Sequence, residues 1–276
     1  MGNVRALLSR PIELYLRLIG VQIRSQLQYP IPFVMDILIS TWSTLIFFIA
    51  LALVLQRFGS LAGWNIGEIA FLWGIAEASF GLNELIFSGF DDTDFSQLIR
   101  KGSFDQFLLR PVTITLQVLG SRFYLRRLGR ILEGIIIFTY SLSVLHLTWS
   151  PGRAGFLLLV VIGQVLFFGG LFITGATITI WTIEPIEVIN IFTYGGVEVI
   201  SYPFSIYPDW LRNFFTYILP AIFLNYYPAL YLLNKPDPFH LPGFAVFLAP
   251  LAGLFVFLAA YTFWRVGLRH YQSTGS

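Results

Sequence analysis

Long apolar stretches dominate the hydrophobic pattern of this chain of 276 residues. The clearest of them cover residues 33–55, 66–87, 128–147, 155–181 and 243–264. Each is long enough to cross a hydrocarbon core of roughly 30 Å as a helix. The pattern therefore predicts an all-α membrane protein and not a soluble domain.

One further span can be placed in either of two segments. Residues 186–204 carry two glutamates and an asparagine, whereas residues 213–233 are more apolar but contain two prolines. If the first segment crosses, residues 207–233 become a re-entrant external hairpin before the last span, with tyrosines and a tryptophan at the depth of the lipid headgroups. Either choice predicts six spans.

The pattern of residues 4–29 has a helical period of a different kind. Apolar residues share one face at about 100° per residue, and charged residues gather on the opposite face. The apolar face holds Leu8, Ile12, Tyr15, Ile19 and Ile23, and the charged face holds Arg10, Glu13, Arg17 and Arg24. This pattern predicts an amino-terminal interfacial helix that lies on anionic membrane lipid, with a partner-binding helix as the alternative. Pro30 and Pro32 are expected to end it.

Composition supports the membrane assignment. The chain is 56% hydrophobic and 17% aromatic, only 12% of its residues are charged, and its mean hydropathy is +0.74. With residues 186–204 as the fifth span, thirteen of the 17 lysines and arginines fall on one side and four on the other. Because positive residues accumulate on the cytoplasmic side, both termini and residues 89–127 are predicted to be cytoplasmic in a multi-pass protein of the cell (inner) membrane.

Several kinds of chemistry are excluded by the residues present. The chain has no cysteine, and its three histidines have no metal-ligand spacing. The two lysines, Lys101 and Lys235, precede glycine and proline, so no phosphate-binding loop exists. A net charge of +2 is too small to indicate a nucleic-acid partner. We therefore expect no enzyme active site, no metal and no cofactor on this chain.

A stripe of small and polar residues follows one side of the span at residues 66–87. It consists of Gly74, Glu77, Gly81, Glu84 and Ser88. Carboxylates at membrane depth are costly and usually face a cavity or another helix. We predict a translocation path or polar contacts between helices at Glu77, Asn83, Glu84 and Glu198. Pairing with Arg126 or Arg130 is the structural alternative, and a proton relay in a secondary transporter is a further one.

The predicted cytoplasmic loop, residues 92–111, contains two short helices. Asp92, Thr93 or Asp94 can cap the first, and Gly102 can end it. The second runs from Ser103 to Arg110 before Pro111 stops it. Its side chains Phe104, Phe107 and Leu108 share a face, while Asp105, Gln106 and Leu109 point elsewhere. This face suits docking into a groove on a partner, or contact with the bilayer surface or the protein's own helices.

The layout and this loop resemble the permease subunit of a type-2 ABC exporter. The layout is similar along the whole chain, and the run RKGSFDQFLLRPV at residues 100–112 is similar to a passage of a small six-span permease subfamily. The resemblance implies residues 186–204 as the fifth span and a coupling helix between spans 2 and 3. The implied contacts with an ABC ATPase subunit are Ser103, Phe104, Asp105, Phe107, Leu108, Leu109 and Arg110. ATP and Mg²⁺ would bind to that ATPase, and a second permease chain, identical or paralogous, would complete the assembly.

These expectations lead to one hypothesis about function. The chain is a permease subunit that exports an amphiphilic or hydrophobic substrate by alternating access, driven by separate ATPase subunits that move spans 2 and 3 through the loop. A secondary transporter, an intramembrane enzyme and a non-transporting membrane scaffold subunit are the alternatives.

Overall fold

A computed structural model describes residues 11–273, so the first part of the predicted interfacial helix lies outside the described residues. The described part is helical and contains no β-strand. Its α-helices are α2 (Pro11–Gln26), α3 (Pro30–Phe58), α4 (Ile66–Phe87), α5 (Asp92–Arg100), α6 (Asp105–Leu108), α7 (Ile114–Leu119), α8 (Leu128–Leu145), α9 (Pro151–Thr182), α10 (Glu187–Ser201), α11 (Asp209–Asn213), α12 (Tyr226–Leu232) and α13 (Ala249–His270).

Five helical stretches of the described residues are long and apolar enough to cross a membrane. They are Pro30–Phe58, Ile66–Arg100, Leu125–Leu145, Pro151–Thr182 and Ala249–His270. The all-α class predicted from the sequence is confirmed, and each of the five clear apolar stretches overlaps one of these helices along most of its length. The further span, predicted in residues 186–204 or 213–233, is not among them.

The segment predicted as the fifth span forms a short helix. α10 has 15 residues and is therefore about 22 Å long, which is less than a hydrocarbon core of roughly 30 Å. Its C-cap, Tyr202, is extended and precedes Pro203, which cannot donate the backbone hydrogen bond that would continue the helix. The following residues, 207–233, form α11 and α12 with irregular turns between them, so re-entry of this part remains a prediction.

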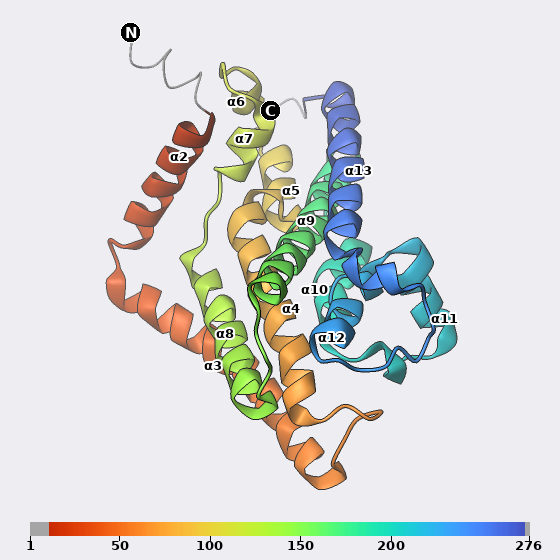
Figure 1. Cartoon of the computed structure of the whole chain (residues 1–276). Coiled ribbons are helices and arrows are strands. Elements are labelled where there is room, and N and C mark those ends of the chain that lie inside the picture. The colour runs from red at the N-terminus through yellow and green to blue at the C-terminus, as the bar shows by residue number, and fades with distance from the viewer. Residues whose placement is uncertain (1–10, 274–276) are drawn as a thin grey trace.

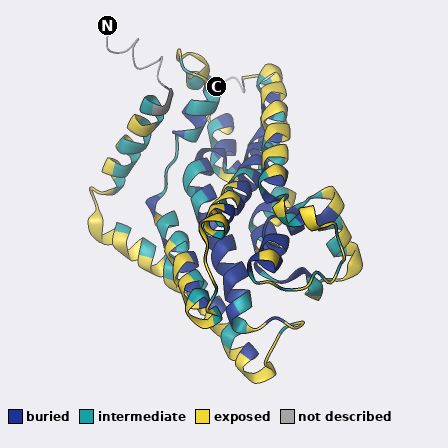
Figure 2. Cartoon of the chain, viewed as in Figure 1, coloured by how far each residue is buried: buried dark blue, intermediate teal, exposed yellow. Residues whose placement is uncertain are grey.

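The helices form a bundle around α4. Figure 2 shows α4 almost wholly buried, whereas α3 lies at the edge of the bundle with large apolar side chains exposed along most of its length. α2, α6, α7 and the C-terminal end of α13 lie at one end of the molecule (Figure 1). α11 and α12 lie beside the N-terminal end of α13. α4 therefore reaches most of the other long helices, and polar groups on it are placed to contact them.

Small residues allow the closest helix contacts. A Cβ atom added at Gly74 of α4 would lie 2.6 Å from the backbone nitrogen of Phe138 on α8, and one at Gly134 of α8 would clash with Ala78. α9 and α13 meet in the same way, because a Cβ atom at Gly253 would clash with the carbonyl of Gly163. Such residues let helix backbones approach closely in a lipid environment.

Candidate functional site

Four charged side chains join α4 to the start of α8. We call Glu77, Glu84, Arg127 and Arg130 the α4–α8 charge cluster. Glu77 and Glu84 lie two turns apart on the face of α4 that meets α8 and are almost completely buried. Arg127 and Arg130 lie one turn apart where α8 begins, so their side chains point toward the same face. The sequence thus places two carboxylates of α4 opposite two guanidinium groups at the start of α8.

Arg130 is the centre of this cluster. Its guanidinium pairs with Glu77 through Nε and through Nη2, the latter at 3.3 Å, and its Nη1 lies 3.5 Å from Glu84. Arg127 pairs with the other oxygen of Glu84. Of the two arginines considered from the sequence, only Arg130 makes these contacts. Arg126 is exposed and lies over the Tyr124 ring at 5.2 Å.

A pocket of about 240 Å³ opens beside this cluster, between α3, α4, α8 and α10. We call it the glutamate pocket. It is lined by Thr44, Phe47, Trp73, Glu77, Arg130, Glu133, Glu198 and Tyr202. Two of the four residues predicted for a polar path, Glu77 and Glu198, therefore meet at one place. Glu133 and the aromatic side chains were not predicted from the sequence as part of this pocket.

Asn83 lies elsewhere in the bundle. Its side chain is fully buried, does not line the glutamate pocket and has no hydrogen-bond partner among the described residues. The fourth predicted residue, Glu84, is held by the two arginines and does not line the pocket either. Of the four residues, Glu77 and Glu198 line the pocket, and Glu77 and Glu84 make polar contacts between helices.

The predicted coupling loop has two helices, but its second helix is shorter than expected. Asp91, and not one of the three residues after it, caps α5 by accepting hydrogen bonds from the backbone of Thr93 and Asp94. Gly102 follows α5 with a φ of 66°, as a glycine that ends a helix often does. α6 is a single turn, because Pro111 disfavours helical geometry at the residue before it.

Phe104 is not available to a partner in this conformation. Its side chain is 0% exposed and lies 5.4 Å from the ring of Phe95 on α5 and 4.9 Å from the ring of Tyr271, which follows α13. The predicted docking face is therefore divided. Phe104 holds the segment to its own protein, whereas Leu108 is 45% exposed and Leu109, expected to point elsewhere, is 85% exposed.

Polar contacts strengthen the attachment of this segment to the end of α13. Asp105 accepts hydrogen bonds from the hydroxyls of Ser273 at 2.6 Å and Tyr271 at 2.8 Å. These bonds hold the pKa of Asp105 below its usual value. Burial, together with the bond to Asp105, raises the pKa of Tyr271 to about 12. The ionised form of Asp105 therefore stabilises the attachment of this segment to the end of α13.

We expect this attachment to depend on pH. Because the pKa of Asp105 is lower in the folded than in the unfolded state, its stabilising contribution is present above the unfolded value of about 3.9 and is lost as the pH falls through the lowered value. The unfolding temperatures of the wild type and an Asp105→Asn variant should differ at pH 7 and converge in acid. A Gln106→Asn variant should show no such pH-dependent difference. A constant difference at every pH would contradict this role of Asp105.

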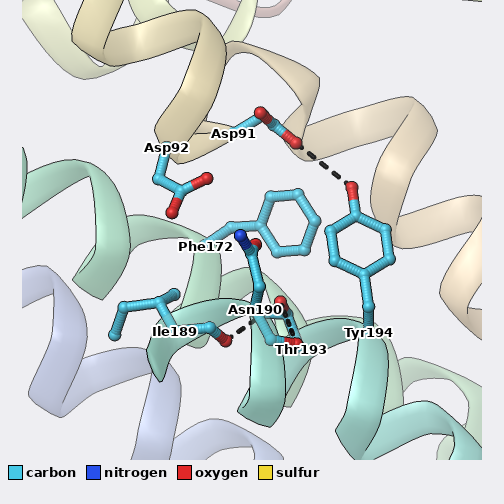
Figure 3. Close-up of a pocket in the computed structure, with 7 residues that line it drawn as sticks. All are labelled: Asp91, Asp92, Phe172, Ile189, Asn190, Thr193 and Tyr194. Carbon is cyan, nitrogen blue, oxygen red and sulfur yellow. Dashed lines mark hydrogen bonds between the residues drawn. The ribbon is translucent and has the colours of Figure 1, made fainter. Parts of the chain in front are cut away.

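A second contact joins the beginning of α5 to α10 (Figure 3). The hydroxyl of Tyr194 donates to Asp91 at 3.2 Å, so the residue that caps α5 also contacts α10. Beside it lies a pocket of about 10 Å³, about the size that one water needs, lined in part by Asp92 and Asn190. No sequence pattern predicts this contact, because its partners, Asp91 and Tyr194, are far apart in the chain.

Comparison with known proteins agrees with this architecture. A family model described as ABC-2 family transporter protein matches residues 38–275. No match was found among curated proteins or among solved structures. Because the family match covers more than half of the chain, and the described residues contain several apolar helices long enough to cross a membrane, this protein belongs to the ABC-2 transporter family as a multi-pass membrane permease.

Proposed function

We propose that this chain is the transmembrane subunit of an ABC exporter for an amphiphilic or hydrophobic substrate. Separate ATPase subunits would bind ATP and Mg²⁺ and drive alternating access, and a second permease chain, identical or paralogous, would complete the translocation route. The six-span topology and the cytoplasmic position of both termini are parts of this proposal. The observation that carries it is an exposed turn, α6, whose segment is attached to other helices in a chain of the ABC-2 transporter family.

The attachment of α6 gives the proposed coupling a physical route. Leu108 and Leu109 form an exposed apolar tip that a groove on an ATPase could bury. Directly behind this tip, Phe104 contacts Tyr271 at the end of α13. A push on the tip would therefore be transmitted to α13 and not only to the two spans that the loop connects.

Contacts of α5 extend the route to further helices. The ring centres of Phe95 and of Trp264 on α13 lie 5.5 Å apart. The Nη1 atom of Arg100 lies 3.3 Å from Oε1 of Glu184, just after α9. Asp91 contacts α10 through Tyr194. The exposed ion pair contributes little energy by itself. Together, however, these contacts support movement of α5 and α6 with the ends of α9, α10 and α13 as one unit.

The test is whether an ATPase depends on the exposed tip. Tagged protein purified from its native membranes is expected to contain a bound ATPase that hydrolyses ATP. In a Leu109→Glu variant the ATPase activity should be at least about tenfold lower, because a charge would be buried in an apolar groove. Gln106→Glu, which adds the same charge at an exposed polar position of the segment, is the matched control. Full activity in the Leu109 variant would contradict the proposed contact. Absence of any ATPase from the wild type would favour a secondary transporter or a scaffold subunit.

A further inference from the structure

The glutamate pocket is lined by more carboxyl groups than guanidinium groups. In the neighbouring α4–α8 charge cluster, two carboxylates are balanced by two guanidinium groups. Glu133 and Glu198 also line the pocket, and neither makes an ion pair within 4.0 Å among the described residues. The carboxyl groups on one side of the pocket are thus paired with arginines, whereas those on the other side are not.

Glu133 is a buried group with unused hydrogen-bonding capacity. Its side chain is 0% exposed, and its Oε1 accepts one hydrogen bond from the indole Nε1 of Trp73 at 3.3 Å. Its Oε2 has no hydrogen-bond partner among the described residues. The hydroxyl of Thr44 lies beside Glu133, and it donates to the carbonyl oxygen of Ser40 at 3.0 Å. A buried carboxylate oxygen left in this state is costly unless a proton or a ligand satisfies it.

Aromatic side chains form much of the remaining wall. Phe47, Trp73 and Tyr202 line the pocket, and the rings of Trp73 and Tyr202 lie 5.3 Å apart in an edge-to-face arrangement. Aromatic faces attract organic cations, and tryptophan does so most strongly. The described residues contain no group of three or more His, Cys, Asp or Glu that could hold a metal ion. Carboxylates with aromatic walls therefore favour an organic cation over a bare metal ion.

The pocket is also accessible from outside the bundle. Glu198 is exposed, and among the described residues it has no hydrogen-bond or ion-pair partner that would hold it away from the pocket. Phe47, on α3, is 68% exposed. Arg130 does not block a cation, because Glu77 and Glu84 engage its guanidinium and its remaining face lies 4.5 Å from the Phe80 ring. A ligand entering past Phe47 would meet Glu198 first and Glu133 deeper inside.

We propose that the glutamate pocket binds the cationic group of an amphiphilic organic cation, such as a substituted ammonium, with Glu133 and Glu198 as its counter-ions and the aromatic residues as its walls. This inference rests on the proposed function, since it names the substrate class of the exporter. A headgroup-sized part of the substrate occupies the pocket, and its apolar part extends along the exposed face of α3.

Binding can be measured on the full chain in neutral detergent, without any ATPase. The probe is radiolabelled benzyltrimethylammonium in equilibrium dialysis against empty micelles, with its uncharged isostere neopentylbenzene and with benzenesulfonate as competitors. The wild type is expected to bind the cation saturably, and neither competitor should displace it. Glu133→Gln and Glu198→Gln should each weaken binding at least about tenfold. Glu184→Gln, at an exposed carboxylate outside the pocket, is the matched control and should leave binding unchanged.

Three results would overturn the proposal: no saturable binding by the wild type, binding by both pocket variants as tight as that of the wild type, or displacement of the cation by the uncharged isostere. Glu198 is exposed, so its variant remains informative even if Glu133→Gln fails to fold. The outcome is separable from that of the proposed function. A chain that binds the cation but recruits no ATPase keeps the site and refutes the exporter, and the converse result refutes only the site.

Discussion

Replacing Arg130 by methionine is expected to lower the free energy of unfolding by about 3–5 kcal/mol. The guanidinium contacts Glu77 and Glu84, both almost completely buried, so its removal leaves one carboxylate without its ion pair and weakens the compensation of the other. Methionine retains much of the side-chain length that lies against Phe80. Lost charge compensation, and not lost volume, therefore accounts for most of the expected change.

The measurement is equilibrium unfolding in mixed micelles, compared with two further variants. Arg126→Met removes an exposed arginine only four positions earlier and should change stability by less than about 1 kcal/mol. Adding Glu77→Gln to Arg130→Met should recover part of the loss, because it removes one of the uncompensated charges. If Arg130→Met and Arg126→Met were equally stable, the charge cluster would not stabilise the contact between α4 and α8.

Much of the helical framework could be predicted because lipid imposes a simple rule. A stretch of about 20 apolar residues must satisfy its backbone within one helix, and α3, α4, α8, α9 and α13 follow this rule. α10 does not, since its 15 residues include polar groups and the chain after it turns at Tyr202 and Pro203. Apolar composition alone could not distinguish such a short helix with irregular turns from a complete span.

The candidate sites were predictable where partners repeat at helical spacing. Glu77 and Glu84 lie seven residues apart, so their shared face could be read from the sequence, and arginines near the start of α8 were natural partners. Periodicity cannot show what a face contacts. It grouped Phe104 with Phe107 and Leu108 but could not show that Phe104 is covered by Tyr271, because that contact joins residues far apart in the chain.

Replacing Phe104 by alanine is expected to release α6 from α13 while leaving the exposed tip in place. Truncating a buried phenylalanine costs about 3–5 kcal/mol, and here the lost contacts are those with Phe95 and Tyr271. Backbone hydrogen bonds of the segment, such as that from Phe107 to the carbonyl of Phe104 at 2.9 Å, should then open more often. Hydrogen exchange of residues 104–108 should accelerate roughly hundredfold, the factor that corresponds to about 3 kcal/mol.

Two variants separate attachment of α6 from recognition of a partner. Leu109→Ala, at a side chain that is 85% exposed, should leave exchange unchanged. Tyr271→Phe keeps the ring beside Phe104 but removes the hydroxyl that donates to Asp105, so it should accelerate exchange by less than Phe104→Ala does. In the ATPase assay we expect the opposite dependence on the two positions. Phe104→Ala should retain the bound ATPase, whereas Leu109→Glu should lose it. Unchanged exchange in Phe104→Ala would show that α6 is held by contacts other than this aromatic one, and the proposed route to α13 would fail.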